Sequence, residues 1–156
     1  MISAIRAYKK FLNSNYDGAR ILGLHMEGPF LNPELGAQRP ELCEIPKRDG
    51  FEEYLKEAGD ILSIMTLSPE LDGSVELIRS LRRRGIIPAA GHSTAGEEIL
   101  KKSYSAGLRH ATHIFNATRR PDSGLRGVIK TGMDEFCLLH DDIFCDIVVD
   151  GNKIHV

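Results

Sequence analysis

A chain of 156 residues is long enough for one domain with its own hydrophobic core. With 42% hydrophobic and 27% charged residues, its composition excludes an intrinsically disordered protein. The formal net charge of −2 gives no reason to expect nucleic acid as a partner, and no apolar run reaches the roughly 18 residues of a membrane span. There is no apolar segment typical of a secretory signal, and the 3 cysteines lack C-x-x-C spacing, so we expect a cytoplasmic protein with free thiols.

Five short apolar runs recur along the chain, between segments of helical periodicity. They cover residues 20–26, 60–67, 85–91, 109–115 and 144–150. Within each run the apolar residues are continuous and do not alternate with polar ones. Continuous runs are typical of parallel strands that are covered on both faces, so the sequence predicts an α/β fold.

Four helices are predicted before and between these runs. Apolar residues recur at helical spacing over 2–12 and over 51–58, and Gly59 follows the second segment as its expected C-terminal cap. Asp72 is expected to be the N-cap of a third helix, which Gly85 closes. The T-x-x-E pattern at 94–97 predicts a capping box at the start of the fourth.

This β-α order is compatible with two architectures, an open doubly wound sheet and a (β/α)8 barrel. Five strands cannot close an eight-stranded barrel, and such barrels typically need about 250 residues. Length alone therefore favours the open sheet.

Polar residues stand at the ends of several runs. The first run leads into Glu27, the third into His92 of "GHS", the fourth contains His113 of "HATH", and the fifth leads into Asp150. Ligands of parallel α/β folds bind at the carboxyl ends of the strands, so the first three side chains can converge on a divalent metal. Two histidines, one carboxylate and an open position form a known catalytic zinc site, in which the ion lowers the pKa of water to about 7.

Each of these residues also has an ordinary structural explanation. Glu27 could cap a turn, His92 could be a polar residue at a helix start, and His113 could be a buried histidine with a hydrogen-bond partner. Spacing alone does not decide between these explanations and a metal site. His25 is expected one layer below Glu27 on the same face, and His110 on the face opposite to His113, so both are interpreted as structural.

Four strings in the chain resemble, in the same order, those of N-acetylglucosamine-6-phosphate deacetylases of the amidohydrolase superfamily. They are "GLHMEGPFLNPELGAQ", "AAGHSTAG", "HATHIFNA" and "VVDGNKIHV". The resemblance covers essentially the whole chain, and the first and third strings are its most specific parts. It implies that residues 1–156 form part of a metal-dependent TIM-type (β/α)8 barrel, roughly its third to seventh βα units, in place of an open sheet.

The resemblance also implies roles for individual residues. Glu27, His92 and His113 would hold a zinc or iron ion. The substrate-binding positions would be Ala37, Gln38, Asn116, Ala117 and His155. Arg119, Arg120 and Arg126 are all candidates for a phosphate-binding arginine, and Arg120 is our choice among them.

Two departures from the family pattern stand out. Gln38 replaces a histidine that polarises the acetyl carbonyl; glutamine can donate a hydrogen bond to an oxyanion but cannot carry a proton. The catalytic Asp of the family would lie beyond Val156 and an early H-x-H strand before Met1, so we expect a truncated and nearly inactive chain. If activity were found, Asp150 would be the first candidate for an internal base.

The implied reaction is hydrolysis of the acetamide of N-acetylglucosamine 6-phosphate to glucosamine 6-phosphate and acetate. The implied partners are this amino sugar phosphate and, as in the full-length family, a second copy in a homodimer. Two alternatives remain, an amidohydrolase acting on another N-acetyl sugar and a catalytically inactive structural remnant.

Overall fold

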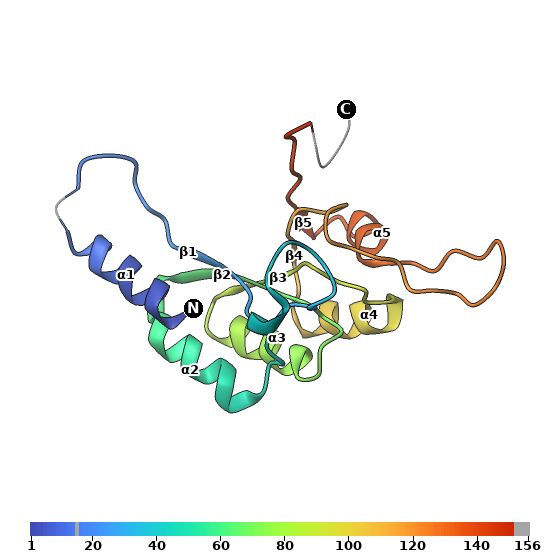
Figure 1. Ribbon diagram of the computed structural model, residues 1–156, viewed down its shortest axis with the longest axis horizontal. Helices are drawn as coiled ribbons and strands as arrows, with labels where there is room; N and C mark the ends of the chain where they lie inside the picture. Colours follow the sequence, from blue (N-terminus) through green and yellow to red (C-terminus); the bar gives the residue numbers. More distant parts are fainter. Residues whose placement is uncertain (15, 152–156) are drawn as a thin grey trace.

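The computed structural model describes residues 1–14 and 16–151, and in these residues five parallel strands form one sheet (Figure 1). The strands are β1 (Leu24–Glu27), β2 (Leu62–Leu67), β3 (Ile87–Ala90), β4 (His110–Ala111) and β5 (Phe144–Cys145). Each overlaps one of the predicted apolar runs, which confirms the α/β class. All five strands are shorter than the runs, because apolar residues continue into the segments before or after the paired residues.

The strand order in the sheet is β1-β2-β3-β4-β5, which is the order along the chain. In a doubly wound sheet the order reverses at a switch point and helices cover both faces. Here the described strands show no reversal, so right-handed crossovers place successive helices on one side. The open doubly wound sheet that length alone favoured is therefore wrong, and the part of a (β/α)8 barrel that the resemblance implied is confirmed.

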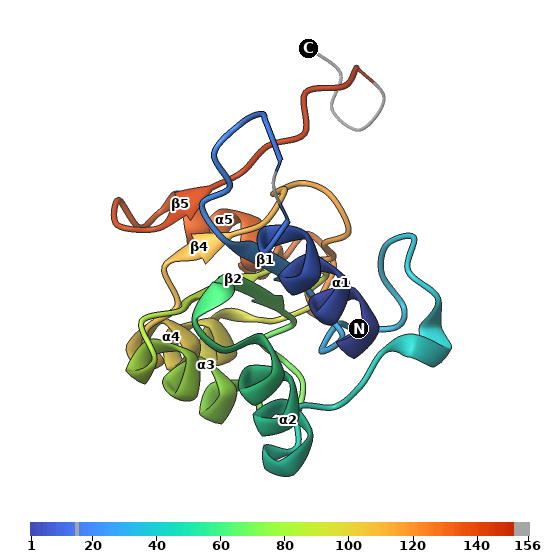
Figure 2. The same cartoon turned by 90° about the vertical axis from the view of Figure 1, so that its left-hand side faces the viewer.

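Helices between successive strands form the outer layer of this barrel segment. They are α2 (Arg48–Ala58), α3 (Ser74–Arg83), α4 (Glu97–Ala106) and α5 (Met133–Leu138), and each contacts the next (Figures 1 and 2). A further helix, α1 (Ile2–Leu12), precedes β1 and packs against α2. No helix in the described part of the chain is long and apolar enough to cross a membrane.

Two of the predicted helix caps are wrong. The N-cap of α3 is Gly73 and that of α4 is Gly96, in place of Asp72 and Thr94. Thr94 donates its hydroxyl hydrogen to the carboxylate of Glu70 on another loop. The Thr94 hydroxyl therefore bonds to a residue that is distant in the sequence and does not cap α4.

The hydrophobic core lies between the sheet and these helices. Alternate strand residues contribute to it, as expected from the two-residue period of a strand. Its members on β1 to β4 include Met26, Met65, Leu67, Ala90 and Ala111. Those on the helices include Leu55, Leu77, Ile78, Leu81 and Leu100.

The other face of the sheet carries polar side chains. Thr66 Oγ1 on β2 lies 2.7 Å from His25 Nε2 on β1 and 2.7 Å from Thr112 Oγ1 after β4. Between the two threonines stands Gly91, where an added Cβ would lie only 2.7 Å from Thr66 Cγ2 and 3.4 Å from Thr112 Cβ. Because Gly91, just after β3, has no side chain, there is space for the side chains of Thr66 and Thr112 to contact each other.

Candidate metal site

Glu27, His92 and His113 meet at the carboxyl end of the sheet. Glu27 is the last residue of β1, His92 lies two residues after β3, and His113 two residues after β4. Glu27 Oε1 is 2.6 Å from His92 Nε2 and 2.8 Å from His113 Nε2. One ligand atom from each residue lies within 4.8 Å of the other two, so the structure brings together the three residues expected to bind a metal.

The contacts within this group shift the protonation of its members. Hydrogen bonds from His113 and His92 hold the pKa of Glu27 well below its ordinary value, although burial acts in the opposite direction. The same contact with Glu27 raises the pKa of His113. A negative carboxylate therefore stands between two imidazole rings.

The donor set fits a divalent cation. His92 Nδ1 lies 3.1 Å from the carbonyl oxygen of Leu35, an acceptor, so Nδ1 carries a proton. His92 Nε2 faces Glu27 Oε1 at 2.6 Å, and at this distance a proton or a metal ion must lie between the two atoms. Imidazole and carboxylate ligands suit zinc and iron alike. A backbone carbonyl on the second ring nitrogen is the usual support of a metal-binding histidine.

Left-handed backbone conformations occur at several residues around the site. The φ angles are 49° at His92, 36° at His113, 65° at Phe115 and 53° at Ala117. Such conformations cost roughly 1–3 kcal/mol in non-glycine residues and persist where surrounding contacts enforce them. Two of the four are the histidines of the candidate metal site, where the chain leaves β3 and β4.

The sequence predicted that His110 faces the side of the sheet opposite to His113, and this prediction is wrong. Because β4 ends at Ala111 and φ is positive at His113, strand alternation does not continue from 110 to 113. The His110 ring lies on the polar face, with its centroid 6.3 Å from that of His25, and its Nε2 is 2.9 Å from Asp146 Oδ2.

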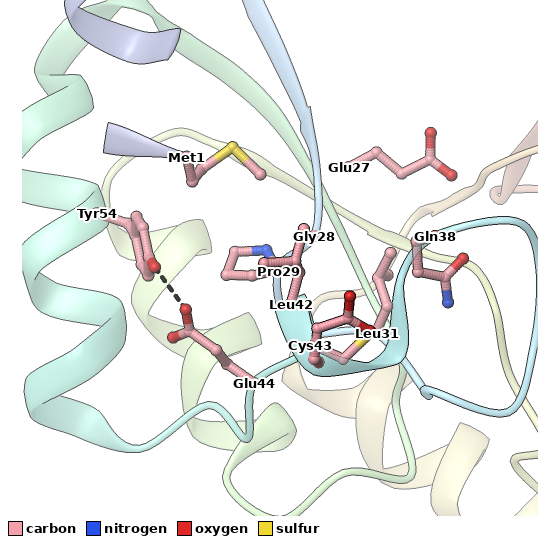
Figure 3. Close-up of a pocket in the computed structure, with 11 residues that line it drawn as sticks. Met1, Glu27, Gly28, Pro29, Leu31, Gln38, Leu42, Cys43, Glu44 and Tyr54 are labelled. Atoms are coloured by element: carbon pink, nitrogen blue, oxygen red, sulfur yellow. Dashed lines mark hydrogen bonds between the residues drawn. The ribbon is translucent and has the colours of Figure 1, made fainter. Parts of the chain in front are cut away.

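Gln38 lines a pocket of about 310 Å³ together with Glu27 (Figure 3). Its amide Nε2 donates to the carbonyl oxygens of Leu35 and Asn32, the latter at 3.1 Å, so both of its N–H groups are used within the loop. Its Oε1 is buried and has no hydrogen-bond partner among the described residues. The sequence predicted that Gln38 donates a hydrogen bond to an oxyanion. In this arrangement its N–H groups are already used within the loop, so it does not make that bond.

The expected substrate-binding residues lie on loops at the same end of the sheet. Ala37 precedes Gln38 on the loop after β1, whereas Asn116 and Ala117 follow β4. Asp134 fixes the loop after β4, because its two carboxylate oxygens accept from Phe115 N at 3.0 Å and from Thr118 Oγ1 at 2.6 Å.

The candidate arginines differ in their partners. Arg120 is paired with Glu135, and Arg119 lies 3.5 Å from Glu34. Arg126 is exposed, as is Asp150. His155 lies outside the described residues.

Comparison with known proteins supplies the relationship. No protein-family model matches the chain. The chain is 36% identical over 151 residues to N-acetylglucosamine-6-phosphate deacetylase of Bacillus subtilis. This match covers 96% of the chain and 37% of that protein. The human protein of the same name is 38% identical over 120 residues, or 73% of this chain and 29% of its own length.

Solved structures agree with these relatives. The deacetylase of Mycobacterium smegmatis, as a D267A mutant in complex with N-acetyl-D-glucosamine-6-phosphate, matches with a TM-score of 0.80 and 26% identity over 98% of this chain and 37% of its own. The enzyme of Pasteurella multocida gives a TM-score of 0.77 and 30% identity, over 97% and 38%. The chain therefore spans well under half of these proteins, and over nearly its whole length it is a homologue of the N-acetylglucosamine-6-phosphate deacetylases.

Proposed function

We propose that this chain carries the metal-binding part of a site that hydrolyses the acetamide of N-acetylglucosamine 6-phosphate to glucosamine 6-phosphate and acetate. The observation that supports this most strongly is the convergence of Glu27, His92 and His113 within 4.8 Å at the carboxyl end of the sheet. A divalent cation held there, zinc or iron, would supply a Lewis acid that polarises the amide carbonyl and lowers the pKa of water.

The chain's own residues would bind and orient the substrate. The hydrogen bond between His92 Nδ1 and Leu35 O fixes the ring, so that Nε2 faces Glu27. Gln38, which lines the pocket beside Glu27, would contact the sugar. Asn116 and Ala117, held on the loop that Asp134 fixes, would contact the sugar phosphate.

The test is release of glucosamine 6-phosphate by the purified chain with added zinc or iron. We expect a slow rate that a chelator abolishes, and a loss of this rate in Glu27→Gln, which keeps the size of the side chain but removes its charge. A rate that is equal in the wild-type and Glu27→Gln chains would contradict the proposed reaction.

The phosphate group should be recognised by Arg120. Its guanidinium is held beside Glu135, and a planar fork of N–H donors matches the geometry of phosphate. Charge-assisted hydrogen bonds contribute about 1.5–3 kcal/mol, so Arg120→Ala should weaken binding of the phosphorylated sugar about 10- to 100-fold. Binding of unphosphorylated N-acetylglucosamine should change little.

Calorimetry with the two sugars and the metal-loaded chain measures this difference. Arg119→Ala is the matched control, because Arg119 is adjacent in sequence and makes only a 3.5 Å contact with Glu34. Equal losses on the two sugars in Arg120→Ala, or a larger loss of discrimination in the control, would exclude Arg120 as the phosphate-binding residue.

A further inference from the structure

Glu70 lies between the loops that carry the candidate metal site. It follows β2 by three residues in the string "SPE". Its Oε1 accepts hydrogen bonds from Asn32 Nδ2 at 2.9 Å, from Thr94 N at 2.8 Å and from Thr94 Oγ1 at 3.2 Å, and its Oε2 accepts from Ser93 Oγ at 2.7 Å. Asn32 belongs to the loop after β1, and the other donors belong to the loop after β3. One carboxylate thus joins the loops that follow three adjacent strands.

The partners of Glu70 stand on both sides of His92. Ser93, which is fully buried, follows His92 directly and also accepts a hydrogen bond from Ala95 N at 2.9 Å. Ser68 Oγ lies 2.7 Å from His92 O, to which it donates, and accepts from Asn32 N at 2.7 Å. The backbone of His92 is therefore held by groups that Glu70 binds directly or through Asn32.

This restraint matters because the conformation of His92 is unfavourable by itself. Its φ of 49° lies in the left-handed region, which a histidine leaves readily unless its neighbours prevent it. If the turn relaxed, the ring would move away from Glu27, since the position of Nε2 depends on this backbone angle. The contacts of Glu70 provide the opposing force.

The chemistry of Glu70 differs from that of an ordinary surface carboxylate. Among the described residues it has no lysine or arginine partner within 4.0 Å, and all of its donors are neutral. Hydrogen bonds to an ionised acceptor are roughly twice as strong as neutral ones. Four such bonds hold the loops after β1 and β3 in a fixed arrangement around Glu70, which a single surface ion pair does not do.

We propose that Glu70 is a positioning residue of the metal site, whose carboxylate fixes the turn from Gly91 to Thr94 so that His92 Nε2 points at Glu27. The inference rests on the proposed metal site and extends it to a residue that does not touch the ion. Residues that orient metal ligands typically change metal affinity 10- to 100-fold when they are replaced.

Three variants test this role. Glu70→Ala removes all four hydrogen bonds to Glu70, and Glu70→Gln keeps the size but places an N–H group opposite the Ser93 hydroxyl. Ser93→Ala removes one of the four bonds to Glu70, together with the bond from Ala95 N, while leaving Glu70 in place. Glu76→Gln is the matched control, because it removes the same charge from an exposed glutamate of α3 that lies 3.7 Å from Arg48.

Two measurements are made on the purified chain: cobalt(II) affinity by chelator competition, and metal-free proton–nitrogen correlation spectra of the histidine rings. We expect cobalt affinity to fall about 10- to 100-fold in both Glu70 variants and about three- to tenfold in Ser93→Ala. The ring signals of His92 should shift in all three. Those of His140, which binds Phe136 O away from the site, should stay in place, and Glu76→Gln should match the wild type.

The metal-free spectra separate the two proposals. A wild-type chain that binds no cobalt would contradict the proposed metal site, whereas a His92 shift in the variants would still support the role of Glu70. Unchanged His92 signals in folded Glu70→Gln and Ser93→Ala would overturn it. If the Glu70 variants fail to fold, the His92 signals of Ser93→Ala alone test the proposal. Equal shifts of the His92 and His140 signals would indicate a general structural role of Glu70 and would also overturn the proposal.

Discussion

Replacing His92 by alanine should weaken binding of zinc or cobalt by about 10²–10³-fold. Structural zinc sites with four ligands have apparent binding free energies of roughly 10–16 kcal/mol, so one ligand of such a set contributes about 2.5–4 kcal/mol. His92 is 7% exposed and offers Nε2 directly to the position shared with Glu27 and His113. Chelator competition followed by absorption spectroscopy of the cobalt form measures the loss.

His140→Ala is the control for the removal of an imidazole ring. His140 is not part of the candidate metal site; its Nδ1 contacts Phe136 O at 2.7 Å and its ring stacks on that of Phe136. We expect this variant to keep wild-type cobalt affinity. If His92→Ala binds cobalt as tightly as His140→Ala, then His92 is not a ligand.

Replacing Gly36 by alanine should damage the site without removing any ligand. A Cβ there would lie 2.4 Å from His92 Nδ1 and 2.6 Å from Gln38 Oε1, and the φ of +87° is unfavourable for any residue with a side chain. The ring of His92 would have to move, which would break its contact with Leu35 O. We expect cobalt affinity to fall about 10- to 100-fold, as for loss of a ligand-orienting contact.

Gly124→Ala separates the collision from the backbone strain. Gly124 also has a positive φ, +67°, but an added Cβ there would meet no atom within 4 Å. Both variants should therefore lose roughly 1–2 kcal/mol of stability from the left-handed conformation, whereas only Gly36→Ala should lose cobalt affinity. Equal cobalt affinities in the two variants, measured alongside denaturant unfolding curves, would show that Gly36 does not shape the site.

Much of the fold could be predicted from the sequence because its signals are local. Continuous apolar runs marked all five strands, and the polar residues after three of them marked the Glu27, His92 and His113 cluster. The strand order could not be derived from length, since a segment of a barrel and an open sheet have the same β-α pattern. The short helix α5, with only 6 residues, gives too few turns for a periodic pattern.

The other predictions that are wrong concern residues whose side-chain contacts cannot be read from the local sequence pattern. Thr94 carries a cap signal, but its hydroxyl reaches Glu70, which is 24 positions away. The amide of Gln38 turns inward because two carbonyl groups of its own loop accept both of its hydrogens, a geometry that no spacing rule contains. Glu70, a carboxylate three residues after the second run, carries the same positional signal as Glu27, but the sequence does not indicate which loops it joins.

The close approach of Thr66 and Thr112 to Gly91 has a consequence for how this sequence can vary. The hydroxyl groups of Thr66 and Thr112 can lie 2.7 Å apart because Gly91, just after β3, carries no side chain. A larger residue at position 91 would have to be accompanied by smaller ones at 66 or 112, and Thr66 also contacts His25 below Glu27. Positions 66, 91 and 112 are far apart in the chain, and they lie on β2, just after β3 and just after β4. Whether a substitution at one of them is acceptable therefore depends on the residues at the other two.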